Sequence, residues 1–276
     1  MILTAVDDNF LPEAVSLIKS CASRAPRHRF YLFLVNSTEE RIVRVRRFHP
    51  NLIVEHVQWP YDAQRWRGLM CSARAAPILY VLETYKEPAL YLDSDMLVMG
   101  SIDGLFAELE SYDLMVQYRP EADVLGAGGT RKAGRFNSGV IALRPSDVSI
   151  EFARRYDRRI REWIDTGKPL CRYDEDCGIE TCIDQEFLYL VYEQFRERLR
   201  FAPLPDKFND SRFRPDSIIW HGKGVSRKRL PYVLAKLSYD NLFVYYVFLL
   251  IRFPFCFVYY HLQQRVLAWK KRRVRI

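Results

Sequence analysis

The strongest constraint on the fold is the alternation of apolar strand-like segments with helix-like segments over the first two thirds of the chain. Predicted strands cover residues 1–6, 29–35, 52–57, 89–98, 136–143 and 217–221, and predicted helices cover 12–22, 38–48, 70–85, 151–164 and 184–195. Strand–helix–strand order places successive strands parallel in one sheet. The sequence therefore predicts an α/β fold with a doubly wound, mostly parallel sheet flanked by helices. Ligands of such sheets bind beyond the carboxyl ends of the strands.

Two acidic residues interrupt one of these apolar segments, "LYLDSDMLVMG" (Leu90–Gly100). If the segment continues as a strand, Asp93 and Asp95 point to the same face. Two carboxylates that close are unfavourable unless a cation lies between them, and hard divalent cations prefer oxygen ligands. The alternative is a turn in which one aspartate caps the next element and the other is solvated. Asp7 follows the first strand, so both acidic groups should open into one crevice, which favours a metal site.

The composition is that of an ordered globular protein. The chain has 276 residues, of which 49% are hydrophobic, and it contains no repeat or low-complexity run. The first ten residues lack a basic region and a long apolar region, so we expect no cleaved signal peptide. The six cysteines form no C-x-x-C pair, and "CRYDEDCGIETC" (Cys171–Cys182) has no nearby histidine. We therefore expect reduced thiols in a cytosolic protein, with a disulfide within this cluster as the alternative.

The positive charge is concentrated at the carboxyl terminus. The net charge is +8, and the segment "RVLAWKKRRVRI" (Arg265–Ile276) supplies six basic residues and no acidic one. A nucleic-acid-binding domain would distribute its charge along a groove or a helix face. We therefore expect no nucleic-acid partner.

The segment before this tail is apolar and aromatic. "LFVYYVFLLIRFPFCFVYY" (Leu242–Tyr260) has 19 residues and is broken by Arg252 and Pro254. A spanning helix needs about 20 apolar residues, and an arginine at the bilayer centre is costly. We predict that residues 231–276 form a helical, aromatic and basic extension that lies on an anionic membrane surface. The alternative is a buried helix pair that closes the domain or forms a dimer.

Five motifs occur in order along the chain: "AVDDNF", "DSD", "FNSGV", "DQ" and "HGKG". They resemble the motifs of retaining glycosyltransferases of the GT-A fold, close to family 8, the galactosyltransferase and glycogenin-like group. The resemblance covers about residues 1–227. One departure is the end of the last motif, where the family has Lys and then Pro-Trp and this chain has Arg227, Lys228, Arg229 and Leu230. Whether Lys223, Arg227 or Lys228 contacts a diphosphate stays open.

The resemblance implies a role for each matching residue. It implies a Mn²⁺ site, with Mg²⁺ as an alternative, formed by Asp93, Asp95 and His221. It places Asp184 and Gln185 beside the anomeric carbon as the catalytic pair, and Asp7 on an N–H of a uracil ring. The residues implied to bind the nucleotide and the donor sugar are Ala5, Asp7, Asn9, Phe10, Arg74, Asp93, Ser94, Asn137, Ser138, Gly139, Gly224 and Arg227.

The resemblance also implies an activity for a catalytic domain at residues 1–230. This activity is the retaining, Mn²⁺-dependent transfer of a hexose from a UDP-sugar to a glycan or glycolipid acceptor in cell-surface polysaccharide or lipopolysaccharide synthesis. We expect the protein in the cytoplasm, at the inner face of the membrane. A sugar nucleotidyltransferase is an alternative, but "VDDNFLPEA" lacks the glycine-rich basic loop of that class. A non-catalytic carbohydrate- or lipid-binding scaffold is another, and the intact motifs count against it.

Overall fold

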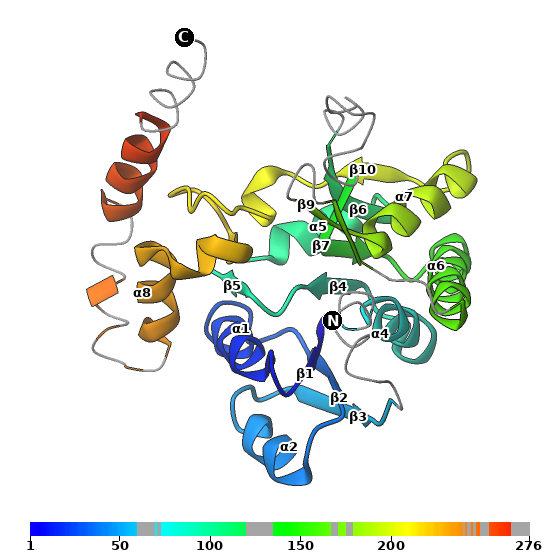
Figure 1. Ribbon diagram of the computed structural model, residues 1–276, viewed down its shortest axis with the longest axis horizontal. Helices are drawn as coiled ribbons and strands as arrows, with labels where there is room; N and C mark the ends of the chain where they lie inside the picture. Colours follow the sequence, from blue (N-terminus) through cyan, green and yellow to red (C-terminus); the bar gives the residue numbers. More distant parts are fainter. Residues whose placement is uncertain are drawn as a thin grey trace.

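A seven-stranded sheet lies at the centre of the computed structural model (Figure 1). The strand order is β10-β6-β7-β4-β1-β2-β3, and every pair is parallel except those made by β7, which runs antiparallel to both β4 and β6. The predicted α/β class with a mostly parallel sheet is confirmed. The strands are β1 (Ile2–Asp7), β2 (Phe30–Val35), β3 (Leu52–Val57), β4 (Ala89–Leu92), β6 (Leu114–Tyr118), β7 (Phe136–Leu143) and β10 (Phe201–Pro203).

The structure describes residues 1–59, 70, 73–119, 135–166, 171–174, 179–239, 241, 244, 247–248 and 254–265. Within these ranges the predicted strands and helices are present with ends shifted by a few residues, except that the strand predicted over 89–98 is divided into two. The helix predicted over 70–85 is α4 (Ala75–Tyr80), which continues as a π-helix, η1 (Val81–Tyr85). Two of its predicted residues, 71 and 72, lie outside the described part.

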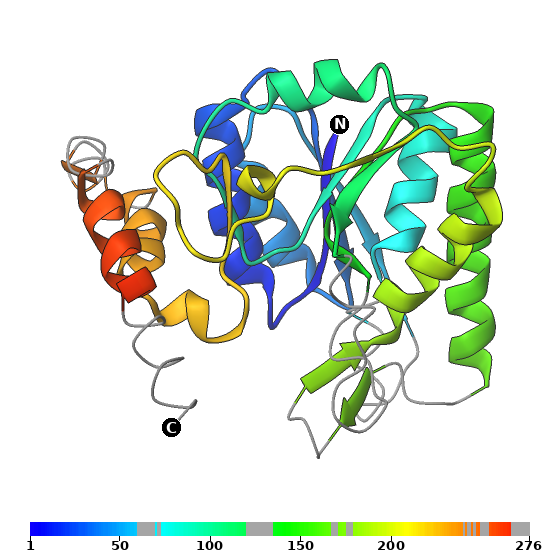
Figure 2. The same ribbon diagram turned by 90° about the horizontal axis from the view of Figure 1, so that it is seen from above.

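Helices cover both faces of the sheet, as Figure 2 shows for α1 in blue and α6 in green. One face packs against α1 (Leu11–Arg24), α2 (Glu39–Arg46) and α5 (Asp103–Leu109). The other packs against α4, α6 (Asp147–Asp165) and α7 (Ile183–Phe195). Alternate residues of one strand enter the two cores, since Ile2 belongs to the first and Leu3 to the second. Burial on both faces explains why these strands are almost continuously apolar.

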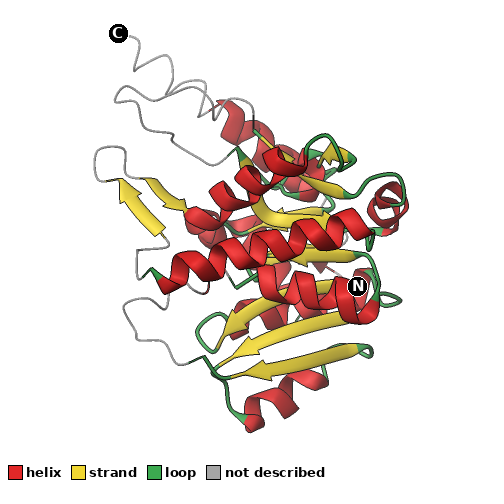
Figure 3. Cartoon of the chain, turned by 90° about the vertical axis from the view of Figure 1, so that its right-hand side faces the viewer, coloured by secondary structure: helices red, strands yellow, loops and turns green. Residues whose placement is uncertain are grey.

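The acidic segment does not continue as one strand, and this part of the prediction is wrong. Asp93 to Asp95 form a turn, after which β5 (Met96–Val98) leaves the main sheet and pairs antiparallel with β11 (Ile219–His221). A second small pair, β8 (Cys171–Asp174) and β9 (Ile179–Cys182), forms a hairpin that stands apart from the sheet in Figure 3. The two carboxylates therefore come together through a turn and not through strand alternation.

The carboxyl-terminal part contains η3 (Asp206–Phe208), η4 (Gly224–Lys228), α8 (Leu230–Ser238) and a helix over residues 254–265. A third core joins α8 to β5 and β11, since Leu97, Trp220 and Tyr232 are buried together. The predicted boundary at residue 230 thus falls at the start of a helix that packs on β5 and β11.

Among the described residues, no helix is both long enough and apolar enough to cross a membrane. About half of the predicted apolar segment, and all of the basic tail beyond residue 265, lie outside the described residues. The membrane association of residues 231–276 stays a prediction.

Candidate metal and donor site

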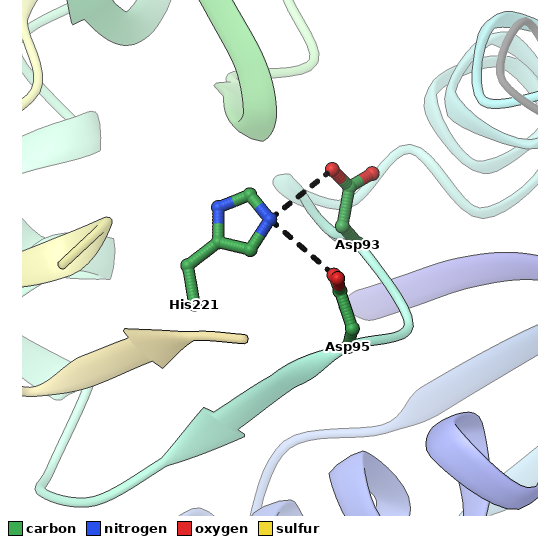
Figure 4. A group of neighbouring side chains, drawn as sticks. All are labelled: Asp93, Asp95 and His221. Atoms are coloured by element: carbon green, nitrogen blue, oxygen red, sulfur yellow. Dashed lines mark ion pairs between the residues drawn. The ribbon is translucent and has the colours of Figure 1, made fainter. Parts of the chain in front are cut away.

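Asp93, Asp95 and His221 converge at one point, as Figure 4 shows. The histidine Nε2 lies 3.3 Å from Asp95 Oδ1 and 3.8 Å from Asp93 Oδ2. One atom of each side chain lies within 4.8 Å of the other two. The aspartates come from the turn between β4 and β5, and the histidine ends β11. Because β11 pairs with β5 so that His221 is opposite Met96, the small sheet places the histidine beside the acidic turn.

Gly139 of β7 forms the floor of this cluster. Its carbonyl accepts a hydrogen bond of 2.9 Å from the Asp93 N–H. A Cβ at this position would lie 2.8 Å from His221 Cε1 and 3.1 Å from Asp93 Oδ2, so a side chain there would displace both groups. Two carboxylates and one imidazole held this close match the ligand preferences of Mg²⁺, Mn²⁺ and similar divalent cations. These residues form a candidate divalent-cation site.

The orientation of His221 is set by Asn209. The histidine is buried, and its Nδ1 lies 2.8 Å from Asn209 Oδ1. If Nδ1 carries the proton, Nε2 presents a lone pair to the aspartates, which is the arrangement found in most metal-binding histidines. Asn209 is not predictable from the sequence, because an asparagine in a loop 12 residues before the histidine has no recognisable spacing.

The electrostatics of the cluster favour an ionised Asp95. Burial opposes ionisation, but without a cation the hydrogen bond and the charge of a protonated His221, together with Arg227, lower the pKa of this carboxyl overall. Arg227 Nε lies 3.8 Å from Asp95 Oδ2. The sequence does not decide which of three basic residues contacts a diphosphate. In the structure Arg227 is half-buried, whereas Lys223 and Lys228 are exposed.

A buried ion network adjoins the cluster. Arg74, just before α4, donates to the Ser138 carbonyl at 2.7 Å and also to the Ser138 hydroxyl. Its guanidinium lies 3.3 Å from Asp184 Oδ2 and 3.4 Å from Asp93 Oδ1. The Ser138 hydroxyl donates to Asp184 Oδ2 at 2.9 Å. The structure thus brings four of the predicted residues, from four different segments, into one connected group.

Asp184 is the most buried acid of this network. Its residue is 0% exposed, and burial raises the pKa of its carboxyl, although Arg74 and Ser138 partly offset that effect. Its Oδ1 atom has no hydrogen-bond partner among the described residues. A buried oxygen in that state is costly unless a ligand or water completes it. Gln185, next to it in the first turn of α7, is half-buried.

The residues of the first motif form a turn between β1 and α1. The Asp7 carboxylate accepts hydrogen bonds from the backbone N–H of Asn9 at 3.0 Å and of Phe10 at 3.1 Å, and from the Asn9 side-chain amide at 3.0 Å. Asn9 and Phe10 are exposed at the start of α1, and Ala5 is buried within β1. The contact of Asp7 with a nucleobase stays a prediction, and the structure gives this carboxylate a role in the turn.

The remaining predicted residues lie around the cluster. Asn137 donates to Gln117 Oε1 at 3.0 Å and accepts from the Gly139 N–H at 3.2 Å, so its side chain supports β7. Ser94 lies in the acidic turn between Asp93 and Asp95. Gly224 has a φ of +55°, a conformation that favours glycine. The structure thus gives Asn137 and Gly224 local structural roles, and donor binding by these residues stays a prediction.

Comparisons with known proteins support the fold. No protein-family profile matches the chain, and no curated protein sequence matches it. The glycosyltransferase GlyE of Streptococcus pneumoniae superposes with a TM-score of 0.53 at 18% identity, covering 81% of this chain and 55% of that protein. The galactosyltransferase LgtC, in complex with donor and acceptor sugar analogues, gives 0.50 at 20% identity over 75% of this chain and 74% of LgtC.

A third similar structure is the apo form of mouse xyloside xylosyltransferase 1. It gives a TM-score of 0.50 at 12% identity and covers 82% of this chain and 98% of that protein. Identities this low establish the fold alone. The chain has the α/β fold of the GT-A glycosyltransferases, and it spans little more than half the length of GlyE.

Proposed function

We propose that the chain is a family 8 type glycosyltransferase that moves a hexose from a UDP-sugar to a glycan or glycolipid acceptor with retention of configuration. The observation that carries this proposal is the Asp93–Asp95–His221 cluster beside the buried Asp184 network, within a GT-A fold. We further propose that Mn²⁺ is the bound metal, and that the protein acts in cell-surface polysaccharide or lipopolysaccharide synthesis, in the cytoplasm at the inner face of the membrane.

The residues of the cluster suit departure of a nucleoside diphosphate. A cation bound by the two aspartates and the histidine would neutralise the negative charge on the leaving phosphate as a Lewis acid. Arg227, close to Asp95, would contribute a planar guanidinium to the same diphosphate. Its side chain is half-exposed and is therefore accessible to a ligand.

The second group of residues would act on the sugar. Asp184 Oδ1, which has no hydrogen-bond partner in the described part of the chain, is an acceptor suited to a sugar hydroxyl, and Arg74 holds the carboxylate in place. Asp184 and Gln185 would orient the sugar and stabilise the positive charge that develops at the anomeric carbon. Because an amide is a poor nucleophile, we favour attack of the acceptor from the same face as the leaving group, with the departing phosphate oxygen taking the acceptor proton.

The test is a screen of UDP-sugars for hydrolysis and of nucleotides for thermal stabilisation, with and without Mn²⁺. We expect stabilisation by UDP with Mn²⁺, but not by GDP or CMP, and hydrolysis of at least one UDP-sugar that EDTA abolishes. Asp95→Asn should lose both effects, whereas Asp216→Asn, at an exposed position, should keep them. Equal stabilisation by GDP or CMP would contradict the donor class, and full hydrolysis in EDTA would contradict the metal.

A further inference from the structure

Tyr232 of α8 reaches the backbone of a predicted metal ligand. Its side chain is almost completely buried, and its hydroxyl donates a hydrogen bond of 2.9 Å to the carbonyl oxygen of Asp95. The two residues are 137 positions apart in the chain. Tyr232 belongs to the segment predicted from the sequence to be a separate extension, yet it contacts the turn that carries both aspartates.

The same carbonyl has a second donor from the other side of the cluster. The backbone N–H of Gly222 donates to the Asp95 carbonyl at 2.8 Å, and Gly222 directly follows His221. The Asp95 carbonyl thus links the two ligand segments, and Tyr232 is the side chain that holds this link. With two donors on one oxygen, the peptide after Asp95 has a fixed plane, and this limits where its side chain can point.

Close packing keeps the tyrosine ring in this position. A Cβ added to Gly222 would lie 2.6 Å from Tyr232 Cζ and 2.8 Å from Arg227 Cγ, so the ring and the arginine stem lie directly on the glycine backbone. Arg227 in turn lies beside the Asp95 carboxylate. A change in the position of the ring would therefore alter two contacts of Asp95, the hydrogen bond to its carbonyl and the ion pair with Arg227.

A second tyrosine, Tyr239 at the C-terminal cap of the same helix, provides an internal comparison. The Tyr239 hydroxyl donates to the carbonyl oxygen of Val98 at 3.1 Å, three residues beyond Asp95 on the same chain segment. Both tyrosines connect α8 to this segment through a hydrogen bond to a backbone carbonyl, and Tyr239 also donates to Met99 Sδ at 3.7 Å. Only Tyr232 bonds to a residue whose side chain belongs to the cation site.

We propose that Tyr232 is a positioning residue for Asp95, so that α8 and the chain beyond residue 230 are needed for full affinity of the cation site. This inference rests on the metal centre proposed above. It goes beyond the sequence motifs, which all lie before residue 230 and by themselves suggest that the carboxyl-terminal segment is dispensable for donor binding. It concerns binding of the cation, and the reaction itself does not involve Tyr232.

The test compares Tyr232→Phe with Tyr239→Phe in the full-length chain. Both changes remove one hydroxyl and its hydrogen bond to a backbone carbonyl, and Tyr239→Phe also removes the contact with Met99 Sδ. The free Mn²⁺ in a titration is measured by electron paramagnetic resonance, and the unfolding midpoint is measured without metal. We expect Tyr232→Phe to raise the Kd for Mn²⁺ about tenfold, at the lower end of the effects of outer partners of metal ligands. Tyr239→Phe should change it less than twofold, although this variant also loses stability.

Two further readouts separate positioning from general loosening. The Mn²⁺ concentration for half-maximal donor hydrolysis should rise in Tyr232→Phe, with the rate restored at saturating Mn²⁺. Gly222→Ala, which displaces the ring without removing its hydroxyl, should also weaken Mn²⁺ binding. Equal Kd values for wild type and Tyr232→Phe, or equal weakening in both tyrosine variants, would overturn the inference. Absence of Mn²⁺ binding in the wild type would instead overturn the proposed metal centre, and this inference with it.

Discussion

Substitution of Gly139 by alanine should weaken binding at the cation site, although it replaces none of the residues that bind the cation. The added Cβ would lie 2.8 Å from His221 Cε1, 3.0 Å from Met96 Cε and 3.1 Å from Asp93 Oδ2. Contacts this short require a shift of the neighbours. Met96 has a flexible side chain, whereas the His221 ring is held by Asn209 and cannot move without losing that hydrogen bond. Asp93 and His221 should therefore separate.

The size of the effect follows from the cost of inserting a methyl group into a packed interior. Such changes cost about 1–3 kcal/mol. Without the cation, the ligands can move apart and relieve this strain. Binding of the cation must then return them to the strained positions, so the free energy of binding becomes less favourable by the same amount. At about 1.4 kcal/mol per tenfold change, the Kd for Mn²⁺ should rise by about 5- to 150-fold.

The matched control is Gly104→Ala in α5. A Cβ there meets no heavy atom within 4 Å, and alanine favours a helix over glycine by about 1 kcal/mol. This variant should bind Mn²⁺ as the wild type does and be no less stable. Mn²⁺ titrations of both variants, after circular dichroism has verified that they are folded, make the comparison. A folded Gly139→Ala protein with a Kd within twofold of the wild type would refute the assignment of the cluster.

Further predictions concern the ligands and the stability of the fold. Asp93→Asn and Asp95→Asn should each abolish donor turnover with an unchanged circular dichroism spectrum, and wild-type rates in either variant would exclude the metal role. His221→Ala should weaken Mn²⁺ binding in the same titration, and an unchanged Kd would remove it from the site. Asp113 is buried, which opposes its ionisation, but hydrogen bonds led by those from Arg200 lower its pKa to about 2. Because the unfolded value is about 3.9, ionised Asp113 stabilises the fold above about pH 4, and this contribution is lost as the pH falls towards 2. Asp113→Asn should therefore lower the free energy of unfolding, measured with urea at pH 7, by about 2 kcal/mol. The difference between this variant and the wild type should narrow between pH 4 and pH 2. A difference that stays constant over this range would contradict the assigned pKa.

The local pattern of the sequence was sufficient to predict the sheet. Strands buried on both faces must be continuously apolar, and the intervening helices must have an apolar stripe, so both can be recognised within a short window. β3 was predicted with its observed ends, Leu52 and Val57. The antiparallel direction of β7 could not be predicted in this way, because the direction of a buried strand leaves no mark on its own composition.

The residues that form the candidate cation site could be predicted from the sequence, whereas the residues that hold them in position could not. Asp93, Asp95 and His221 were predicted from motif order, and the structure brings them together. The geometric reason given for the aspartates was wrong, since they lie in a turn and β5 pairs with a strand more than 100 residues later. Asn209 and Tyr232 were missed, because each acts through a contact that depends on tertiary packing.

The most direct test of the proposed metal centre is a crystal structure with UDP and Mn²⁺, with anomalous scattering measured at the manganese edge. We expect an anomalous peak bonded to the carboxylates of Asp93 and Asp95 and to Nε2 of His221, with the diphosphate on its open side. A peak elsewhere, or a nucleotide bound with the His221 ring turned away from both aspartates, would contradict the proposed metal centre.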